Sequence, residues 1–332
     1  MKSARGGIIC AGNWIVDLVH DVEHWPEESN LVRIGDQTRG IGGGAANVIS
    51  ALARLETGLP LWPMGAIGDD APGTFILEEC RRLGLPTDKI SVKAGVPTAH
   101  THVMSVPGRS RTFFYQGGAN DVLSASDFPE GTFAQSPARL FYLGYLSLLG
   151  DLDRIEPGAM SGAAQVLQRA QNAGLTTCVD LVSIQHPAFQ EIVDSAAPFI
   201  DYLVVNEIEA ARATGTEAEV GSLSDAGTLA HMARFLLTLG VNKAVVVHCV
   251  DRAVWCEPDG EPVTREISRL PQDQIASNLG AGDAFCAGLI FALHEDWGAS
   301  RALDLAVATA RASLRGHTAT AAIPPLTELD LT

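Results

Sequence analysis

The sequence predicts an α/β fold in which a doubly wound, mainly parallel sheet carries helices on both faces. Short apolar runs alternate with longer segments of helical periodicity along most of the 332 residues. Runs such as 244–247 are apolar without a break, as strands of a parallel sheet covered on both faces require. Right-handed crossovers between such strands place ligands at the carboxyl ends of the strands. We expect one domain over residues 1–332.

The predicted elements follow one another in a regular order. Strands are expected at 7–11, 61–67, 139–143, 176–180, 202–206 and 243–248. Helices are expected at 45–56, 73–83, 158–173, 207–214 and 224–239.

Two segments, at about 13–40 and 96–120, do not fit this alternation. The first is rich in turn residues and charge. The second holds two strand-like runs separated by Pro107-Gly108, a pattern typical of a β-hairpin. We expect both segments to form a small accessory sheet. The alternative is a pair of irregular surface loops, and long loops of that kind are uncommon in compact domains.

Composition and charge argue against several classes of protein. The formal net charge of −16 argues against a general nucleic-acid binder, which needs a basic face. Gly, Pro or charged residues interrupt every apolar run before it reaches the length of a membrane span, and no signal peptide is recognisable. The six cysteines form no CxxC pair and are expected to be buried, reduced thiols. We therefore expect a cytoplasmic protein without nucleic-acid or membrane partners.

The most informative stretch is the glycine loop Asn278-Leu279-Gly280-Ala281-Gly282-Asp283. It leads into an apolar, and therefore buried, helix that is expected to reach about Trp297. A helix N-terminus offers unpaired N–H groups and a positive dipole end, and glycines let a phosphate approach the backbone. Asp283 would stand beside this anion site, placed to take a proton from an attacking hydroxyl. Capping alone also favours an acid there by about 0.3–1 kcal/mol, so a structural reading stays open.

A second glycine-rich stretch, Gly40-Ile41-Gly42-Gly43-Gly44-Ala45-Ala46-Asn47, precedes the first predicted helix. Its glycines let the backbone approach a polyhydroxylated ligand, and the Asn47 amide can donate to and accept from neighbouring hydroxyls. Gly40, Gly42 and Ala45 also fit the GxGxxA pattern of dinucleotide-binding proteins. However, the segment does not follow a strand, which disfavours a nicotinamide dehydrogenase.

These two stretches resemble the signatures of the PfkB/ribokinase family of carbohydrate kinases. The resemblance runs from Gly12 to Gly316 and implies a ribokinase-like α/β fold with a small β-sheet lid. It implies that Asp283 is the catalytic base and that the amides around Gly280, Ala281 and Gly282 hold the transferring phosphoryl group. It also implies an acceptor site, made by Asn13, Asp17, Gly42, Gly43 and Asn47.

The segment Asn206-Glu207-Ile208-Glu209 matches the Asn-x-x-Glu motif of the same family. Asn206 and Glu209 are spaced to face one ligand from the start of a helix, and their oxygens suit a hydrated Mg²⁺ bound to triphosphate. The competing reading is that the acids only stabilise the first turn of the helix.

The stretch Gly108–Tyr115 resembles the lid strand of these kinases. Phe113 and Tyr115 share one face of the expected strand, and Phe114 points the other way. The resemblance implies that the lid covers the acceptor site and joins two subunits in a homodimer. A covered edge strand of the main sheet is the alternative.

Two departures from the family pattern concern the nucleotide. The chain has His248-Cys249-Val250-Asp251-Arg252-Ala253 where relatives carry Thr-x-Gly-x-x-Gly, so His248 would replace the usual Thr as a phosphate donor. It also has Ser277-Asn278-Leu279 in place of Asp-Thr-Thr, and the missing carboxylate argues against potassium activation.

The resemblance implies a phosphotransferase that uses ATP and Mg²⁺ to phosphorylate a primary hydroxyl of a sugar. A nucleoside kinase of the same family and a non-catalytic sensor of sugars or nucleotides are the alternatives. The sensor is prompted by the two departures around His248 and Ser277.

Overall fold

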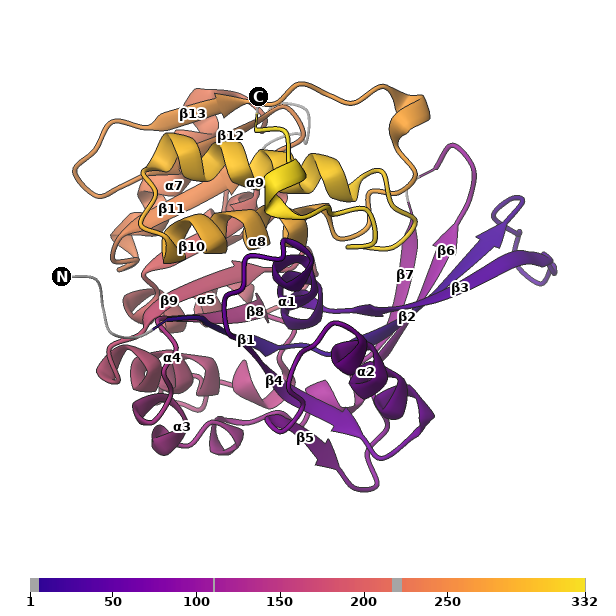
Figure 1. The fold of residues 1–332 in the computed structure, drawn as a ribbon, viewed down its shortest axis with the longest axis horizontal. Helices are drawn as coiled ribbons and strands as arrows, with labels where there is room; N and C mark the ends of the chain where they lie inside the picture. The colour runs from indigo at the N-terminus through magenta and orange to yellow at the C-terminus, as the bar shows by residue number, and fades with distance from the viewer. Residues whose placement is uncertain (1–5, 110, 217–222, 332) are drawn as a thin grey trace.

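A computed structural model describes residues 6–109, 111–216 and 223–331. A nine-stranded sheet with helices on both faces makes the main body, and a four-stranded sheet projects from its side (Figure 1). The predicted doubly wound sheet and the predicted accessory sheet are both confirmed.

The large sheet is parallel over most of its width. Its strands, in spatial order, are β13 (Val263–Glu266), β12 (Arg252–Cys256), β11 (Ala244–His248), β10 (Tyr202–Asn206), β9 (Thr176–Leu181), β8 (Leu140–Leu146), β1 (Ile8–Gly12), β4 (Leu61–Gly68) and β5 (Ile90–Lys93). Neighbours from β11 to β5 are parallel, whereas β12 and β13 are antiparallel additions at one edge. The chain order reverses at β1, which lies between β8 and β4. Ligands of doubly wound folds bind beside the strand ends at such a point.

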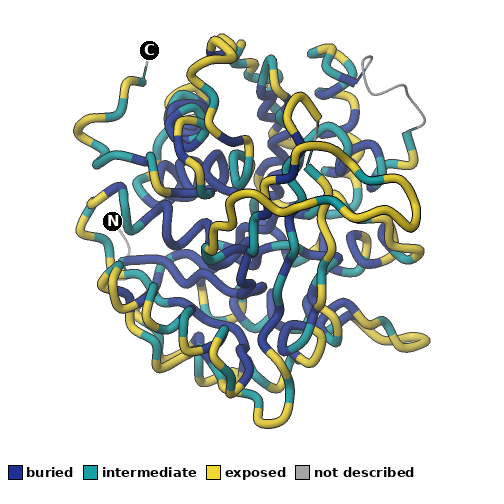
Figure 2. Tube along the Cα trace, turned by 90° about the vertical axis from the view of Figure 1, so that its right-hand side faces the viewer, coloured by how far each residue is buried: buried dark blue, intermediate teal, exposed yellow. Residues whose placement is uncertain are grey.

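Helices cover both faces of this sheet. One face is covered by α3 (Glu130–Ala134), α4 (Gly162–Asn172), α5 (Phe189–Ala196), α6 (Glu207–Thr214) and α7 (Ala226–Thr238). The other is covered by α1 (Gly44–Arg54), α2 (Ala71–Arg82), α8 (Ala281–His294) and α9 (Ala299–Ser313). Strand β1 is continuously apolar because both of its faces are buried. Ile9 and Ala11 pack into one core, and Ile8 and Cys10 pack into the other. The buried trace accordingly runs through the centre of the molecule (Figure 2).

The four-stranded sheet, called the lid sheet below, has the order β3-β2-β6-β7. Its strands are β2 (Ile15–Val22), β3 (Ile34–Gly42), β6 (His100–Ser105) and β7 (Thr112–Gln116). The β6–β7 pair is the predicted hairpin, and β2 with β3 accounts for the first irregular segment. Because these segments pair as strands, the surface-loop alternative is wrong.

The sequence located most elements within a few residues. The helix expected to reach Trp297 ends at His294, because the chain turns back there and the Trp297 ring packs edge-on against Phe291. Helices α3, α5 and α9 and strands β5, β12 and β13 were not predicted. All six cysteines are buried and free, as expected.

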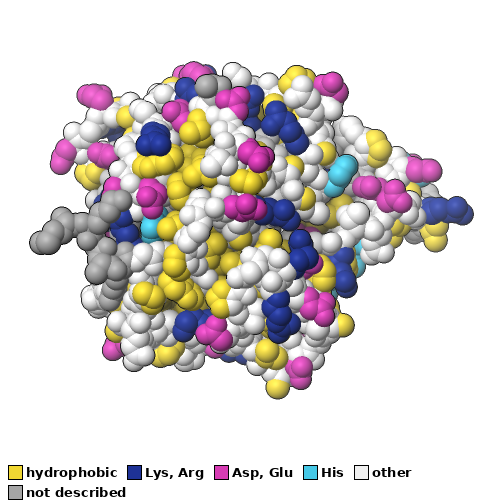
Figure 3. Space-filling view, viewed as in Figure 1, with side chains coloured by type: hydrophobic (Ala, Val, Ile, Leu, Met, Phe, Trp, Pro, Cys, Tyr) yellow, Lys and Arg dark blue, Asp and Glu magenta, His cyan; other side chains and the backbone are white. Residues whose placement is uncertain are grey.

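The surface is mixed in charge. On the face shown in Figure 3, described Lys and Arg side chains are scattered among Asp and Glu side chains. Within the described residues, no helix is both long and apolar enough to cross a membrane.

Candidate active site

A cavity of about 720 Å³ lies where the carboxyl ends of the large sheet face the lid sheet. It is lined by residues at or just after the ends of β8, β9, β10 and β11, together with the glycine loop that begins α8. Lid residues Asp17, Thr101 and Tyr115 close it from the other side. The cavity is therefore at the position that the fold class predicts for a ligand.

The structure brings most of the predicted site residues to this cavity. The lining includes Asp17, Gly43, Asn47, Asn206, Glu209, His248, Gly280, Ala281, Gly282 and Asp283. Two predicted residues, Asn13 and Gly42, are absent from the lining. The fully buried Asn13 donates from Nδ2 to the Leu148 carbonyl (2.7 Å), and a Cβ on Gly42 would come within 2.1 Å of Asp17 Oδ2. Both therefore support the wall of the cavity, and direct contact with a ligand stays a prediction.

The glycine loop bends sharply into α8. Gly280 is the N-cap residue with φ +71°, a left-handed conformation that suits glycine, and a Cβ there would lie 2.4 Å from Ala319 Cβ. The first-turn amides of α8 have no partner within the helix and point to the cavity end. A preformed anion site at this loop follows from the sequence and the backbone together.

Asp283 lies in the first turn of α8 and is 4% exposed. Its Oδ2 accepts hydrogen bonds from Asn47 Nδ2 (2.8 Å) and from the Tyr145 hydroxyl (2.9 Å). Among the described residues, Oδ1 accepts no hydrogen bond. Oδ1 is thus the oxygen available to a substrate.

Burial shifts the pKa of two carboxyl groups at the cavity, those of Asp283 and Asp180. Burial raises the pKa of Asp283 to about 6, against the lowering effect of the bonds from Asn47 and Tyr145. Burial and the nearby Asp283 charge raise the pKa of Asp180, at the end of β9, well above its ordinary value. Near pH 7 Asp283 is therefore mostly ionised and able to accept a proton, whereas burial and the nearby charge favour the protonated form of Asp180.

Tyr145 connects these two acids. Its N–H donates to Asp180 Oδ1 (2.7 Å), and its hydroxyl donates to Asp283. Its φ is +59°, which is uncommon for a bulky residue and often marks a functional site. A Cβ on Gly44 would come within 2.7 Å of the Tyr145 ring, so the absent side chain makes room for it.

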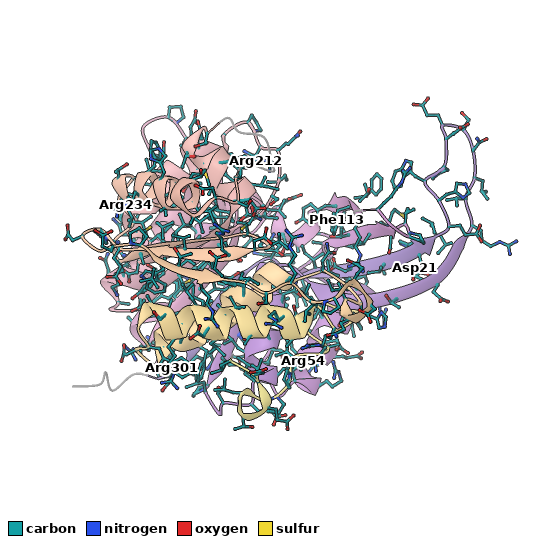
Figure 4. The ribbon with its side chains drawn as sticks, turned by 90° about the horizontal axis from the view of Figure 1, so that it is seen from above. Asp21, Arg54, Phe113, Arg212, Arg234 and Arg301 are labelled. Carbon is teal, nitrogen blue, oxygen red and sulfur yellow. The ribbon has the colours of Figure 1, made fainter. Side chains whose placement is uncertain are left out.

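The lid contributes a further polar residue to the cavity, Asp17. It is 8% exposed and bonds to the Thr101 side chain, and burial raises its pKa to about 7. Phe113 and Tyr115 line the cavity, whereas Phe114 stacks on Trp25 with 6.4 Å between ring centres. The predicted division of this strand into two faces is confirmed. Figure 4 shows Phe113 on the lid strand beside the main body and Asp21 farther along the lid sheet.

Asn206 and Glu209 form a capping box at the start of α6. Asn206 Oδ1 accepts from the amides of Ile208 and Glu209, and Glu209 accepts from Ser183, from the Asn206 amide and from Asn206 Nδ2. These oxygens already hold hydrogen bonds, so the pair does not fit direct coordination of Mg²⁺. Both residues line the cavity, and they fit contact with the water shell of the ion.

His248 lies at the end of β11, beside the glycine loop. Desolvation lowers its pKa to about 4, so the ring is neutral near pH 7. It packs against Phe285 with 4.5 Å between ring centres, and Gly282 lies next to its Cε1. A neutral imidazole here can donate one hydrogen bond to an oxygen held by the loop.

The chain matches the pfkB family of carbohydrate kinases over residues 6–325. It belongs to that family. This family member is 27% identical to a ribokinase of Arabidopsis thaliana over 311 residues, which are 92% of the chain and 75% of the relative. It is 24% identical to a 5-dehydro-2-deoxygluconokinase of Geobacillus kaustophilus over 327 residues, 97% of the chain and 92% of the relative. The chain is thus a carbohydrate kinase, and the predicted class of enzyme is confirmed.

Solved structures agree on the fold of the kinase. The structure of Arabidopsis thaliana ribokinase complexed with ribose and ATP superposes with a TM-score of 0.76 at 24% identity, over 97% of both chains. A ribokinase of Thermotoga maritima gives the same TM-score at 20% identity and also covers 97% of both chains.

Sequence reasoning missed two polar groups of the kinase site, Tyr145 and Asp180. Each follows or ends a predicted strand on the edge where ligands bind, and that position was the signal available. Their meeting depends on the parallel register of β8 with β9, in which Leu143 pairs with Val179. No sequence spacing reveals that register.

Tyr145→Phe is expected to move the acid limb of the pH–activity profile of this kinase. With Asp283 as the predicted base, the limb of the unaltered enzyme should lie at about pH 6, because the carboxyl group must be ionised to accept a proton and its pKa is about 6. Loss of the hydroxyl removes a bond that stabilises the ionised form, so the pKa of Asp283 rises and the limb moves to higher pH. Measuring kcat/KM between pH 5 and 9 tests this. An acid limb at the same pH in Tyr145→Phe would contradict the role given to the hydrogen bond between Tyr145 and Asp283.

Proposed function

We propose that the enzyme transfers the γ-phosphoryl group of ATP to a primary hydroxyl of a sugar. The observation that carries this is the position of Asp283, whose open Oδ1 stands at the amide-rich start of α8 inside the cavity. Base and anion site are adjacent, as in-line phosphoryl transfer requires.

The acceptor hydroxyl gives its proton to Asp283 Oδ1, and its oxygen forms a bond to the γ-phosphorus. The bond between that phosphorus and the β–γ bridging oxygen breaks, and ADP leaves with the electron pair. Asn47 and Tyr145 keep Asp283 ionised and fix its orientation through Oδ2. The amides around Gly280, Ala281 and Gly282 take up the charge of the transferring group.

Asp17, Gly43 and Asn47 hold the acceptor in this proposal. Asp17 lies on the lid, where a carboxylate can accept from two neighbouring hydroxyls. Its pKa of about 7 implies that acceptor binding strengthens as the pH rises through neutrality. Asn13 and Gly42 shape this wall from behind.

Asn206 and Glu209 would hold the water shell of a magnesium ion, and the ion would supply positive charge to offset that of the phosphates. His248 donates a hydrogen bond to a phosphate oxygen in place of the threonine of relatives. The chain has Ser277 where relatives carry a carboxylate, and we propose that it acts without potassium.

The lid keeps water from the reaction. Arg111, which precedes β7, donates from Nη1 to Ser277 Oγ (2.7 Å) ahead of the glycine loop, so lid and loop are already joined. Exclusion of water limits wasteful hydrolysis of ATP.

The test is a screen of ATP consumption by the purified enzyme against neutral sugars, sugar acids, sugar phosphates and nucleosides. A phosphorylated product at catalytic turnover is expected for at least one sugar-derived class. Turnover confined to nucleosides would favour a nucleoside kinase, whose base would stack on Phe113 and Tyr115 in the cavity. Acceptor binding in calorimetry, without ATP binding or turnover, would support the sensor instead.

We further propose that the chain works as one kinase domain in the cytoplasm and pairs with a second copy through the lid. Apolar rings on the lid support this pairing, since Trp25 is 42% and Phe114 52% exposed. Light scattering should report about twice the mass of one chain, which is 35.0 kDa, and the Phe114→Glu variant should have the mass of a single chain. A particle of single-chain mass at all concentrations contradicts the pairing.

A further inference from the structure

Arg111 places a positive charge in an otherwise acidic cavity. The described lining carries the carboxyl groups Asp17, Asp180, Glu209 and Asp283. Arg111 is its sole Lys or Arg side chain among the described residues, and His248 is neutral. A guanidinium stays charged at any working pH.

This charge lacks a carboxylate partner in the described part of the chain. Arg111 is half-buried, and its one hydrogen bond there goes to the neutral hydroxyl of Ser277. Asp17 and Asp21 influence it electrostatically, yet neither comes within the 4.0 Å of an ion pair. Desolvation lowers the pKa of Arg111, against the raising effect of Asp21 and Asp17. A partly desolvated guanidinium with free donors is suited to a bidentate anion.

The anion that fits belongs to the acceptor rather than to ATP. Two carboxyl groups, Asp17 and Asp21, influence Arg111, and both lie on lid strand β2. Asp17 is the residue proposed to bind the acceptor. The residues assigned to the nucleotide, Asn206 and His248, lie at the ends of β10 and β11 in the main sheet. An anionic group held by Arg111 would therefore sit on the lid side of Asp283.

We propose that Arg111 is a specificity residue that binds a carboxylate or phosphate group of the acceptor, so the acceptor is a sugar acid or a sugar phosphate. This inference rests on the proposed kinase activity and narrows its substrate class. The positive charge of Arg111 also offsets the negative charge of the carboxyl groups around Asp17, which would otherwise repel an anionic acceptor.

The first experiment compares kcat/KM for matched acceptors: D-gluconate, 2-keto-3-deoxy-D-gluconate, D-fructose 6-phosphate and D-ribose 1-phosphate against D-ribose, D-fructose and adenosine. We expect an acidic acceptor to exceed every neutral one by about 100-fold, the scale of a partly buried charge-assisted contact. Comparison of the sugar acids with the sugar phosphates in the panel shows whether Arg111 binds a carboxylate or a phosphate. A neutral acceptor with the highest kcat/KM overturns the proposal.

The second experiment uses variants with the preferred acceptor. Arg111→Gln should raise the acceptor KM about 100-fold while the KM for ATP changes less than about 3-fold. Arg111→Lys should recover part of the loss, because it keeps the charge but not the two-pronged geometry. Arg109→Gln, an exposed arginine of the same hairpin, is the matched control and should match the unaltered enzyme.

Ser277→Ala separates ligand binding from a latch between lid and loop, because it removes the hydrogen bond from Arg111, together with the one from the Leu279 amide, and leaves the charge in place. If it reproduces the loss of Arg111→Gln, or if Arg111→Gln raises the KM for ATP instead, the inference is overturned. Calorimetry of the acidic acceptors without ATP adds a readout independent of turnover. If an acidic acceptor binds and Arg111→Gln abolishes that binding, the inference is supported even without phosphoryl transfer. Failure of the inference is therefore distinguishable from failure of the proposed activity.

Discussion

Replacement of Asp283 by Asn is expected to lower kcat by about 10²–10⁴-fold, the contribution of a positioned general base. An amide oxygen can still accept the bonds from Asn47 and Tyr145, so the cavity keeps its shape. The KM values for ATP and acceptor should therefore change only a few-fold, which separates loss of chemistry from loss of binding. Steady-state kinetics with both substrates varied is the measurement.

The matched control for this change is Asp153→Asn. Asp153 is also buried, burial also raises its pKa to about 7, and it accepts from the amides of Ser147 and Leu149, yet its own side chain is absent from the cavity lining. That variant should lose stability while the surviving folded enzyme keeps its kcat. Near-normal turnover by Asp283→Asn would remove the base from the proposed mechanism.

Gly280→Ala should reduce kcat by about 100-fold, because it disturbs the loop whose amides receive the transferring group. The added methyl group would meet Ala319 Cβ at 2.4 Å, and φ +71° disfavours a side chain by about 1 kcal/mol or more. Shifts of about 1 Å at a reacting centre cost rate on this scale. Kinetics at saturating ATP and acceptor measure the loss.

Two further variants make this prediction specific. Gly298→Ala, at the N-cap of α9, adds the same methyl group into open space and should leave kcat unchanged. The double variant Gly280→Ala with Ala319→Gly relieves the contact and should recover part of the activity. If the single Gly280 variant turns over normally, the loop does not hold the transferring group.

Much of the fold could be predicted from the sequence because local patterns determine it. Continuous apolar runs such as 244–247 are typical of strands buried on both faces, and their alternation with amphipathic helices restricts the topology. Strand β13 was missed because only four residues form it, and their burial alternates weakly. Helix α9 was not predicted, although its apolar face packs on α8.

The site could be predicted where function is tied to backbone shape. Gly280 marks a turn whose left-handed backbone disfavours other residues, and Asp283 follows it in the first turn of α8. Tyr145 could not be predicted, because its role depends on a left-handed backbone and on the parallel pairing of β8 with β9. Asn13 illustrates the opposite case, in which a polar residue beside the site turns its side chain into the protein.

Transfer of label from [γ-³²P]ATP tests the central claim most directly. With the preferred acceptor, the unaltered enzyme should move the label into a phosphorylated acceptor in a 1:1 ratio with ADP formed, and Asp283→Asn should move it at least about 100-fold more slowly. Label released only as inorganic phosphate, or transferred equally fast by Asp283→Asn, would contradict the account.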